Sequence, residues 1–117
     1  KSNEKHSLSI ILEQTLPNWQ VHQDFLCRDF EFKDFVDAFS FMTAVALEAE
    51  NIDHHPNWEN CYNKVIVRLQ THTSASITSK DLDLAERIDA GILESSREPF
   101  TYSGSLYADD LQRIVKK

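Results

Sequence analysis

Three histidines and two carboxylates are the side chains of this chain whose types and spacing suit acid–base chemistry. His54 and His55 are adjacent, His72 follows after an alternating stretch, and Glu50 and Asp81 flank the group. Histidine has an ordinary pKa of about 6.5, so it gives and takes protons close to neutral pH. Gathered around one pocket, such a set can transfer protons to and from a substrate. The same set can also form a zinc site, because imidazole and carboxylate are both zinc ligands.

Each of these residues also has a purely structural interpretation. Pro56 restricts His55 to an extended backbone, so the doublet lies in a rigid connection, where it can simply end a helix. Asp81 can be a helix-capping residue and Trp19 a core aromatic. The spacing matches none of the compact zinc motifs, such as H-E-x-x-H. Residue types and spacing alone therefore leave proton transfer, metal binding and helix capping open.

Composition and charge narrow the class of protein. The chain has 117 residues, of which 41% are hydrophobic and 26% charged, which is typical of one soluble globular domain. A net charge of −7 argues against direct binding to nucleic acid or to an anionic membrane face. No apolar run approaches the roughly 18 residues that cross a bilayer, and no secretion signal follows Lys1. Cys27 and Cys61 fit no metal-ligand spacing, so we expect reduced thiols and a cytosolic or nuclear setting.

The hydrophobic periodicity predicts an α+β fold. The expected elements are a helix over 5–16, strands over 19–23 and 26–32 joined as a hairpin, a helix over 33–50, strands over 57–59 and 61–71, and a helix opened by Thr78-x-x-Asp81. This order predicts a two-layer sandwich, in which helices pack on one face of a four-stranded antiparallel sheet. We expect this domain to span residues 1–92. Residues 93–117 are expected to form an extension with a short amphipathic helix.

Two stripes run along the helix predicted over 33–50. The first, expected to cover the sheet, comprises Phe35, Ala38, Phe39, Met42, Val45, Ala46 and Ala49. The second comprises Val36, Ser40, Thr43, Ala44 and Leu47. It is either a mostly solvated face or a second contact surface. In the strand after the doublet, Val65, Val67 and Leu69 are expected to point into the core, with Ile66 on the other side.

The whole pattern resembles a known family. The motif is Glu50-x-x-x-His54-His55-Pro56, followed by Tyr62, His72 and Asp81 at fixed gaps. Around it lie Pro17-Asn18-Trp19, Arg28-x-Phe30-x-Phe32, Val45-Ala46, Leu84-Ala85 and Ile88-Asp89. Over residues 8–89 the chain looks like the pterin-4a-carbinolamine dehydratases. It departs from them in the loop Thr73-Ser74-Ala75-Ser76, where the family usually carries a glycine, and in the length of its tail.

This resemblance implies a lyase that dehydrates 4a-hydroxytetrahydrobiopterin to quinonoid dihydrobiopterin in tetrahydrobiopterin recycling, without metal or organic cofactor. It implies that the pterin lies among residues of two segments, namely His54, His55 and Pro56, and Thr71, His72, Thr73 and Ser74. The three histidines would be catalytic, with the acid and the base unassigned. Glu50, Trp19 and Asp81 would support them.

The resemblance also implies partners. Members of the family form dimers and tetramers, so we expect a homodimer or homotetramer. The family includes a dimerisation cofactor of homeodomain transcription factors. An interaction module with a transcription-factor partner is therefore the competing function.

Overall fold

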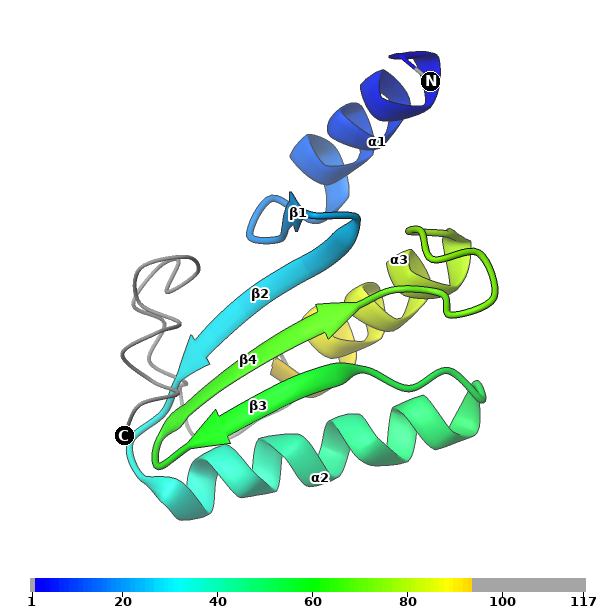
Figure 1. The fold of residues 1–117 in the computed structure, drawn as a ribbon. Coiled ribbons are helices and arrows are strands. Elements are labelled where there is room, and N and C mark those ends of the chain that lie inside the picture. Colours follow the sequence, from blue (N-terminus) through cyan, green and yellow to red (C-terminus); the bar gives the residue numbers. More distant parts are fainter. Residues whose placement is uncertain (1, 94–117) are drawn as a thin grey trace.

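The computed structural model describes residues 2–93, and within them the side chains of residues 8–90 and of Ile92. Its elements are α1 (Ser2–Thr15), β1 (Gln20–His22), β2 (Phe25–Glu31), α2 (Phe35–Asn51), β3 (Asn57–Cys61), β4 (Lys64–Leu69), α3 (Ser79–Glu86) and the π-helical turn η1 (Arg87–Leu93) (Figure 1). The predicted order of elements is confirmed. The extension predicted over 93–117, with its short helix, lies outside the described residues from 94 onward. No helix in the described part of the chain is long and apolar enough to span a membrane.

The four strands form one antiparallel sheet in the order β1-β2-β4-β3. The predicted hairpin between β1 and β2 is present, and it turns at Gln23 and Asp24, with φ of 52° and 67°. Two successive left-handed residues match the twist of a tight hairpin. The β3–β4 connection turns at Tyr62, with φ of 53°, so β4 begins at Lys64 and not at the predicted Cys61. Cys61 instead pairs with Lys64 as the last residue of β3.

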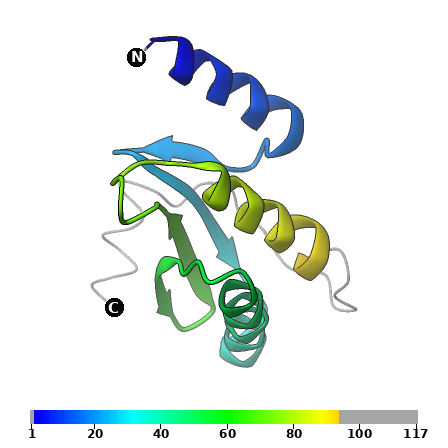
Figure 2. The same cartoon turned by 90° about the vertical axis from the view of Figure 1, so that its right-hand side faces the viewer.

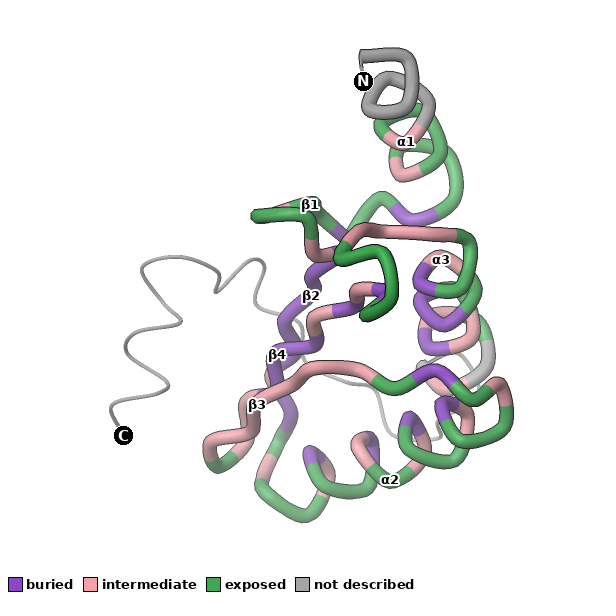
Figure 3. Tube along the Cα trace, turned by 45° about the vertical axis from the view of Figure 1, so that its right-hand side comes forward, coloured by how far each residue is buried: buried purple, intermediate pink, exposed green. Residues whose placement is uncertain are grey.

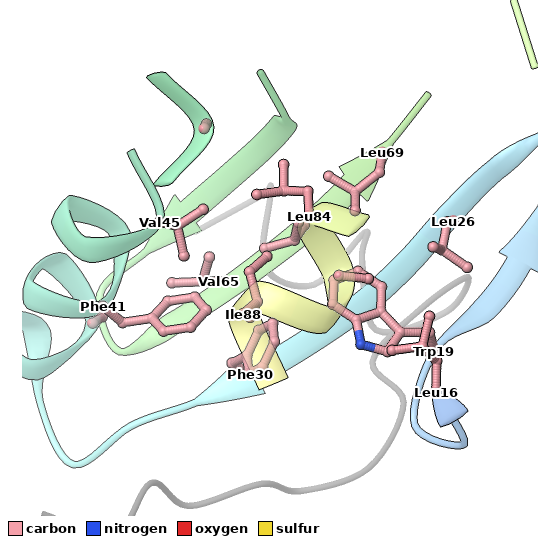
Figure 4. Close-up of a cluster of buried hydrophobic side chains, with 14 of the residues drawn as sticks. Leu16, Trp19, Leu26, Phe30, Phe41, Val45, Val65, Leu69, Leu84 and Ile88 are labelled. Atoms are coloured by element: carbon pink, nitrogen blue, oxygen red, sulfur yellow. The ribbon is translucent and has the colours of Figure 1, made fainter. Parts of the chain in front are cut away.

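Helices α2 and α3 cover one face of the sheet, which gives the predicted two layers (Figure 2). The core between them is built from β2, β4, α2, α3 and the chain around Trp19 (Figure 4). Val65, Val67 and Leu69 of β4 are fully buried in it, as predicted. Ile66, predicted on the other side of the strand, is fully buried too, although it does not belong to this cluster.

The core-facing side of α2 is rotated relative to the prediction. Its buried residues are Ala38, Phe41, Val45 and Ala49, whereas Phe35 and Phe39 are 47% and 53% exposed and Ala46 is exposed (Figure 3). At 3.6 residues per turn, Phe39 lies about 120° around the helix from Val45. The predicted stripe was therefore too wide, because it included Phe35 and Phe39. These two rings contact each other outside the core, with centroids 5.7 Å apart.

Arg87 joins the two covering helices. Its Nη1 donates to Oε1 of Glu48 on α2 at 2.9 Å, and its Nε donates to Oδ1 of Asp83 on α3 at 3.2 Å. The hydrogen bond with Glu48, followed by the one with Asp83, raises the pKa of the Arg87 guanidinium above its ordinary value. The guanidinium is exposed to solvent, so these ion pairs add little to stability. They do tie the C-terminal end of α3 to the last turns of α2.

Candidate active site

The predicted site residues, apart from Trp19, gather at one end of the sheet. Asn57 at the start of β3 pairs with Arg68 near the end of β4. The connection before β3 and the connection after β4 therefore leave the sheet at the same end, as Figure 1 shows. The β1–β2 turn joins them, because Nε2 of Gln70 donates to the carbonyl oxygen of Asp24 at 3.0 Å. We call this region the loop end of the sheet.

A helix-capping motif fixes the backbone of His54. Helix α2 ends at Asn51 with Ile52 as its C-cap, and Asp53 takes a left-handed φ of 53°. The amide of Asp53 then donates to the carbonyl of Glu50 at 3.2 Å, and the amide of His54 to that of Ala49 at 2.9 Å. These two bonds form a Schellman motif, which satisfies the last carbonyls of a helix. His54 is therefore held directly against the end of α2.

The side chain of His54 points inward and contacts Asp81. His54 is 8% exposed and Asp81 is fully buried. Nε2 of the imidazole lies 2.6 Å from Oδ1 of Asp81. An ionised carboxylate only accepts hydrogen bonds, so Nε2 carries the hydrogen. Nδ1 is then the ring nitrogen that this contact with Asp81 does not use.

Asp81 also caps α3. Its Oδ2 accepts from the backbone amide of Thr78 at 2.8 Å, and the Thr78 side chain completes the predicted capping box. The same oxygen accepts from Oγ1 of Thr71 at 2.9 Å. The capping interpretation of Asp81 is thus confirmed, and it coexists with the contact to His54. One buried carboxylate joins the start of α3, the end of β4 and the end of α2.

The other two histidines are exposed. Nε2 of His55 lies 2.9 Å from Oε1 of Glu50, and both side chains are mostly open to solvent. The doublet therefore splits, with His54 turned inward and His55 outward. His72 stands exposed at the start of the loop after β4. Both exposed rings lie on the two connections that meet at the loop end.

A backbone bridge closes the loop that carries His72. Thr71 donates its amide to the carbonyl of Ser76 at 2.9 Å, and Ala75 donates to the carbonyl of Thr71 at 2.8 Å. Ala75 has a left-handed φ of 52°, which explains why a glycine suits this loop. Thr73 and Ser74 in this loop are exposed, and Pro56 on the connection before β3 is partly buried.

Trp19 does not join this group. It is 3% exposed in the core, edge-on to Phe30, and its indole Nε1 donates to Oδ1 and Oδ2 of Asp89 at 3.0 and 3.1 Å. Asp89 also accepts from Nη1 of Arg28 at 2.7 Å. The core interpretation of Trp19 fits this arrangement, and its hydrogen bonds tie the start of the sheet to η1. Thr78 and Asp53, by contrast, belong to the site region but were not predicted as site residues. The capping box indicates Thr78 in the sequence, and the position directly after a helix indicates Asp53.

The residues at the loop end include imidazole and carboxylate groups, which are the types that transfer protons. Their arrangement does not match that of a metal site. Across the residues the structure describes, no group of three or more His, Cys, Asp or Glu side chains is arranged to hold a metal ion. A buried imidazole held by a carboxylate, with exposed imidazoles on the adjoining connections, is an arrangement suited to general acid–base chemistry.

Comparison with known proteins identifies the class. The family model described as pterin 4 alpha carbinolamine dehydratase matches residues 3–91. The chain belongs to this family.

Two bacterial relatives have similar sequences. A protein of Synechococcus sp. (strain WH7803) is 52% identical over 79 residues, which cover 68% of this chain and 85% of that protein. One from Prochlorococcus marinus (strain NATL2A) is 45% identical over 86 residues, covering 74% and 90%. Both carry a provisional assignment as pterin-4-alpha-carbinolamine dehydratase.

Two solved structures share the fold. A transcriptional coactivator/pterin dehydratase from Brucella melitensis is 39% identical, with a TM-score of 0.65, covering 77% of this chain and 93% of that one. A pterin dehydratase-like protein described as a RuBisCO assembly factor in the alpha-carboxysome is 25% identical, with a TM-score of 0.51, covering 62% and 83%. Both of these neighbours are thus described by roles besides dehydration or in place of it.

Proposed function

We propose that this chain dehydrates 4a-hydroxytetrahydrobiopterin to quinonoid dihydrobiopterin and water, as part of tetrahydrobiopterin recycling. In this reaction the hydroxyl on carbon 4a gains a proton, the carbon–oxygen bond breaks and water leaves. The adjacent ring nitrogen loses its proton, and its electron pair forms the new carbon–nitrogen double bond. No electrons are exchanged with an outside reagent. The reaction therefore needs groups that give and take protons near neutral pH, which is the role of histidine.

The observation that carries this proposal is the hydrogen bond between His54 and Asp81. A neutral ring whose Nε2 donates to the carboxylate presents a lone pair at Nδ1. The residue is nearly buried and its backbone is fixed by the Schellman motif. The ring therefore loses little rotational freedom when a substrate binds. We assign His54 to the base that takes the proton from the ring nitrogen.

The two exposed histidines are the candidates for the acid. His72 stands on the loop after β4, and His55 pairs with Glu50 on the facing connection. We propose that the pterin lies between these connections, against Pro56, Thr73 and Ser74. An acid–base group in such a position contributes about 10²–10⁴-fold to rate.

Substitution of the histidines tests the proposal. With the carbinolamine generated by an aromatic amino acid hydroxylase, His54→Ala and His72→Ala should each lower the dehydration rate by about 10²–10⁴-fold. His55→Ala should be less damaging, because adjacent side chains project in different directions and the His55 ring pairs with Glu50 instead of turning inward with His54. His22→Ala, a histidine of β1 outside the motif, is the matched control and should keep the parent rate.

Metal removal separates this proposal from a zinc enzyme. The parent should keep its activity after exhaustive chelation, and elemental analysis should find no stoichiometric metal. If activity were lost on chelation and restored by added zinc, the protein would be a zinc enzyme and the proposal would be wrong.

We further propose that the second stripe of α2 forms an interface between copies of this chain. Val36 and Leu47 are 68% and 69% exposed, and Phe39 beside them is 53% exposed. Large apolar side chains exposed along one helix are typical of a surface that a partner covers. A homodimer or homotetramer follows from a stripe of this kind when the same surface serves both copies.

The competing function is an interaction module, since the Brucella protein is described as a transcriptional coactivator as well as a pterin dehydratase. Such a role uses a surface and does not need the ring chemistry of His54. Capture of a homeodomain partner by a His54→Ala variant that has lost dehydration would show that the two roles are separate. A parent with no dehydratase activity would leave the interaction module as the function. A cytosolic or nuclear location suits either role and stays a prediction.

A further inference from the structure

The hydroxyl of Thr71 is occupied inside the protein, although the family resemblance implies that this residue contacts the substrate. Thr71 is 8% exposed. Its Oγ1 donates to Oδ2 of Asp81 at 2.9 Å and lies 2.5 Å from Oγ1 of Thr78. Its backbone amide donates to Ser76 and its carbonyl accepts from Ala75. The polar groups of Thr71 are thus already bonded before any substrate arrives.

The direction of these hydrogen bonds can be deduced from what each group is able to donate. A hydroxyl has one hydrogen, and the carboxylate of Asp81 can only accept, so the Thr71 hydroxyl donates to Asp81. In the contact between the two threonines, Thr78 is then the donor and Thr71 the acceptor. The chain of donors runs from Thr78 through Thr71 to Oδ2 of Asp81. On the other oxygen, Oδ1, His54 donates from Nε2.

This chain fixes the carboxylate that in turn fixes the imidazole. Oδ2 of Asp81 is held by the Thr71 hydroxyl and by the Thr78 amide, so Oδ1 is left facing Nε2 of His54. In a buried setting each bond of such a network depends on the others, because the local dielectric is low. Without the Thr71 hydroxyl, Oδ2 keeps only the amide and the carboxylate can rotate.

We propose that Thr71 is a positioning residue, which holds His54 in its Nε2-protonated tautomer through Asp81, and that its hydroxyl is not a ligand of the substrate. The inference rests on the proposed function for its effect on rate, but the tautomer itself is a property of the substrate-free protein. Thr71→Val removes the hydroxyl at nearly constant volume, whereas Thr71→Ser retains it. Thr15→Val is a matched control, because the Thr15 hydroxyl donates to the carbonyl of Ile11 within α1, at 2.8 Å and away from the site.

Nitrogen-15 NMR of the imidazoles is the primary measurement. In the parent, Thr71→Ser and Thr15→Val, the His54 shifts should report one tautomer, with the hydrogen on Nε2. In Thr71→Val they should move toward a mixture with the Nδ1-protonated form. A parent already in the Nδ1-protonated form, or a Thr71→Val ring identical to the parent, would overturn the proposal. Even if Thr71→Val does not fold, the parent spectrum shows whether the hydrogen of His54 is on Nε2.

Kinetics on the same variants distinguish positioning from substrate binding. Loss of a hydrogen bond to a charged group should lower kcat of Thr71→Val by about ten- to a hundredfold, with KM nearly unchanged, and Thr71→Ser should recover most of it. A raised KM with the parent kcat would make Thr71 a substrate ligand and refute the inference. If the parent itself shows no dehydration, the proposed function fails, while the NMR result still decides the role of Thr71.

Discussion

The loop that carries His72 contains a backbone conformation that alanine adopts at a cost. Ala75 has φ of 52°, in the left-handed region, and its amide bonds to the carbonyl of Thr71. This region costs a residue with a Cβ about 1–2 kcal/mol. Replacing alanine with glycine adds about 0.5–1 kcal/mol of unfolded-state entropy to be lost on folding. Ala75→Gly should therefore stabilise the protein by about 0.5–1 kcal/mol, which raises Tm by roughly 2–5 °C in a domain of this size.

The same substitution in a helix is the control. Ala46 is exposed in the middle of α2, where glycine costs about 1 kcal/mol. Urea unfolding followed by tryptophan fluorescence, at one protein concentration, should place the midpoint of Ala75→Gly above the parent and that of Ala46→Gly below it. If both variants lose stability by similar amounts, the left-handed residue in this loop is not strained and the reasoning is wrong.

Three further predictions concern the exposed stripe of α2, the core and the C-terminal extension. Leu47→Glu should give smaller particles than the parent in light scattering, because it charges the exposed stripe of α2, and a parent that is monomeric at micromolar concentration would contradict this. Phe41→Ala should cost about 3–5 kcal/mol in denaturant unfolding, since Phe41 is 1% exposed, and a loss below about 1 kcal/mol would remove it from the core. Truncation after Glu94 should leave the dehydration rate near that of the parent, because the motif ends earlier; a folded but inactive product would show that the tail completes the site.

The sequence predicted the elements well and the facing of α2 less well. Val65, Val67 and Leu69 share the core side of their strand as predicted, and the capping box at Thr78 and Asp81 marks a helix start. The apolar residues of α2, however, occupy more than half of its circumference. Periodicity alone therefore could not tell that Phe41 is buried while Phe39 is exposed. Exposed apolar residues of α2 recur at the same helical spacing as its buried ones, so spacing does not separate the two groups.

At the site, the sequence indicated which residues belong together but not how they are bonded. The histidines were found through their types and through the family motif, which requires no geometry. Hydrogen bonds across 27 positions, from His54 to Asp81, depend on where two helix ends meet in space. For the same reason the sequence could not predict the bond from Thr71 to Asp81, because a threonine beside a site histidine gives no sign of where its hydroxyl points.

The shared carboxylate also has a consequence for folding. The ring of His54 is oriented only when α3 is docked, because its partner Asp81 belongs to the first turn of that helix. All four strands and α2 lie within residues 20–69, which precede α3 in the chain. Any species in which α3 is undocked would thus have most of the strand structure and a freely rotating His54. During refolding, competence for the proposed proton transfer should therefore return with the docking of α3, and not with the circular dichroism of the sheet.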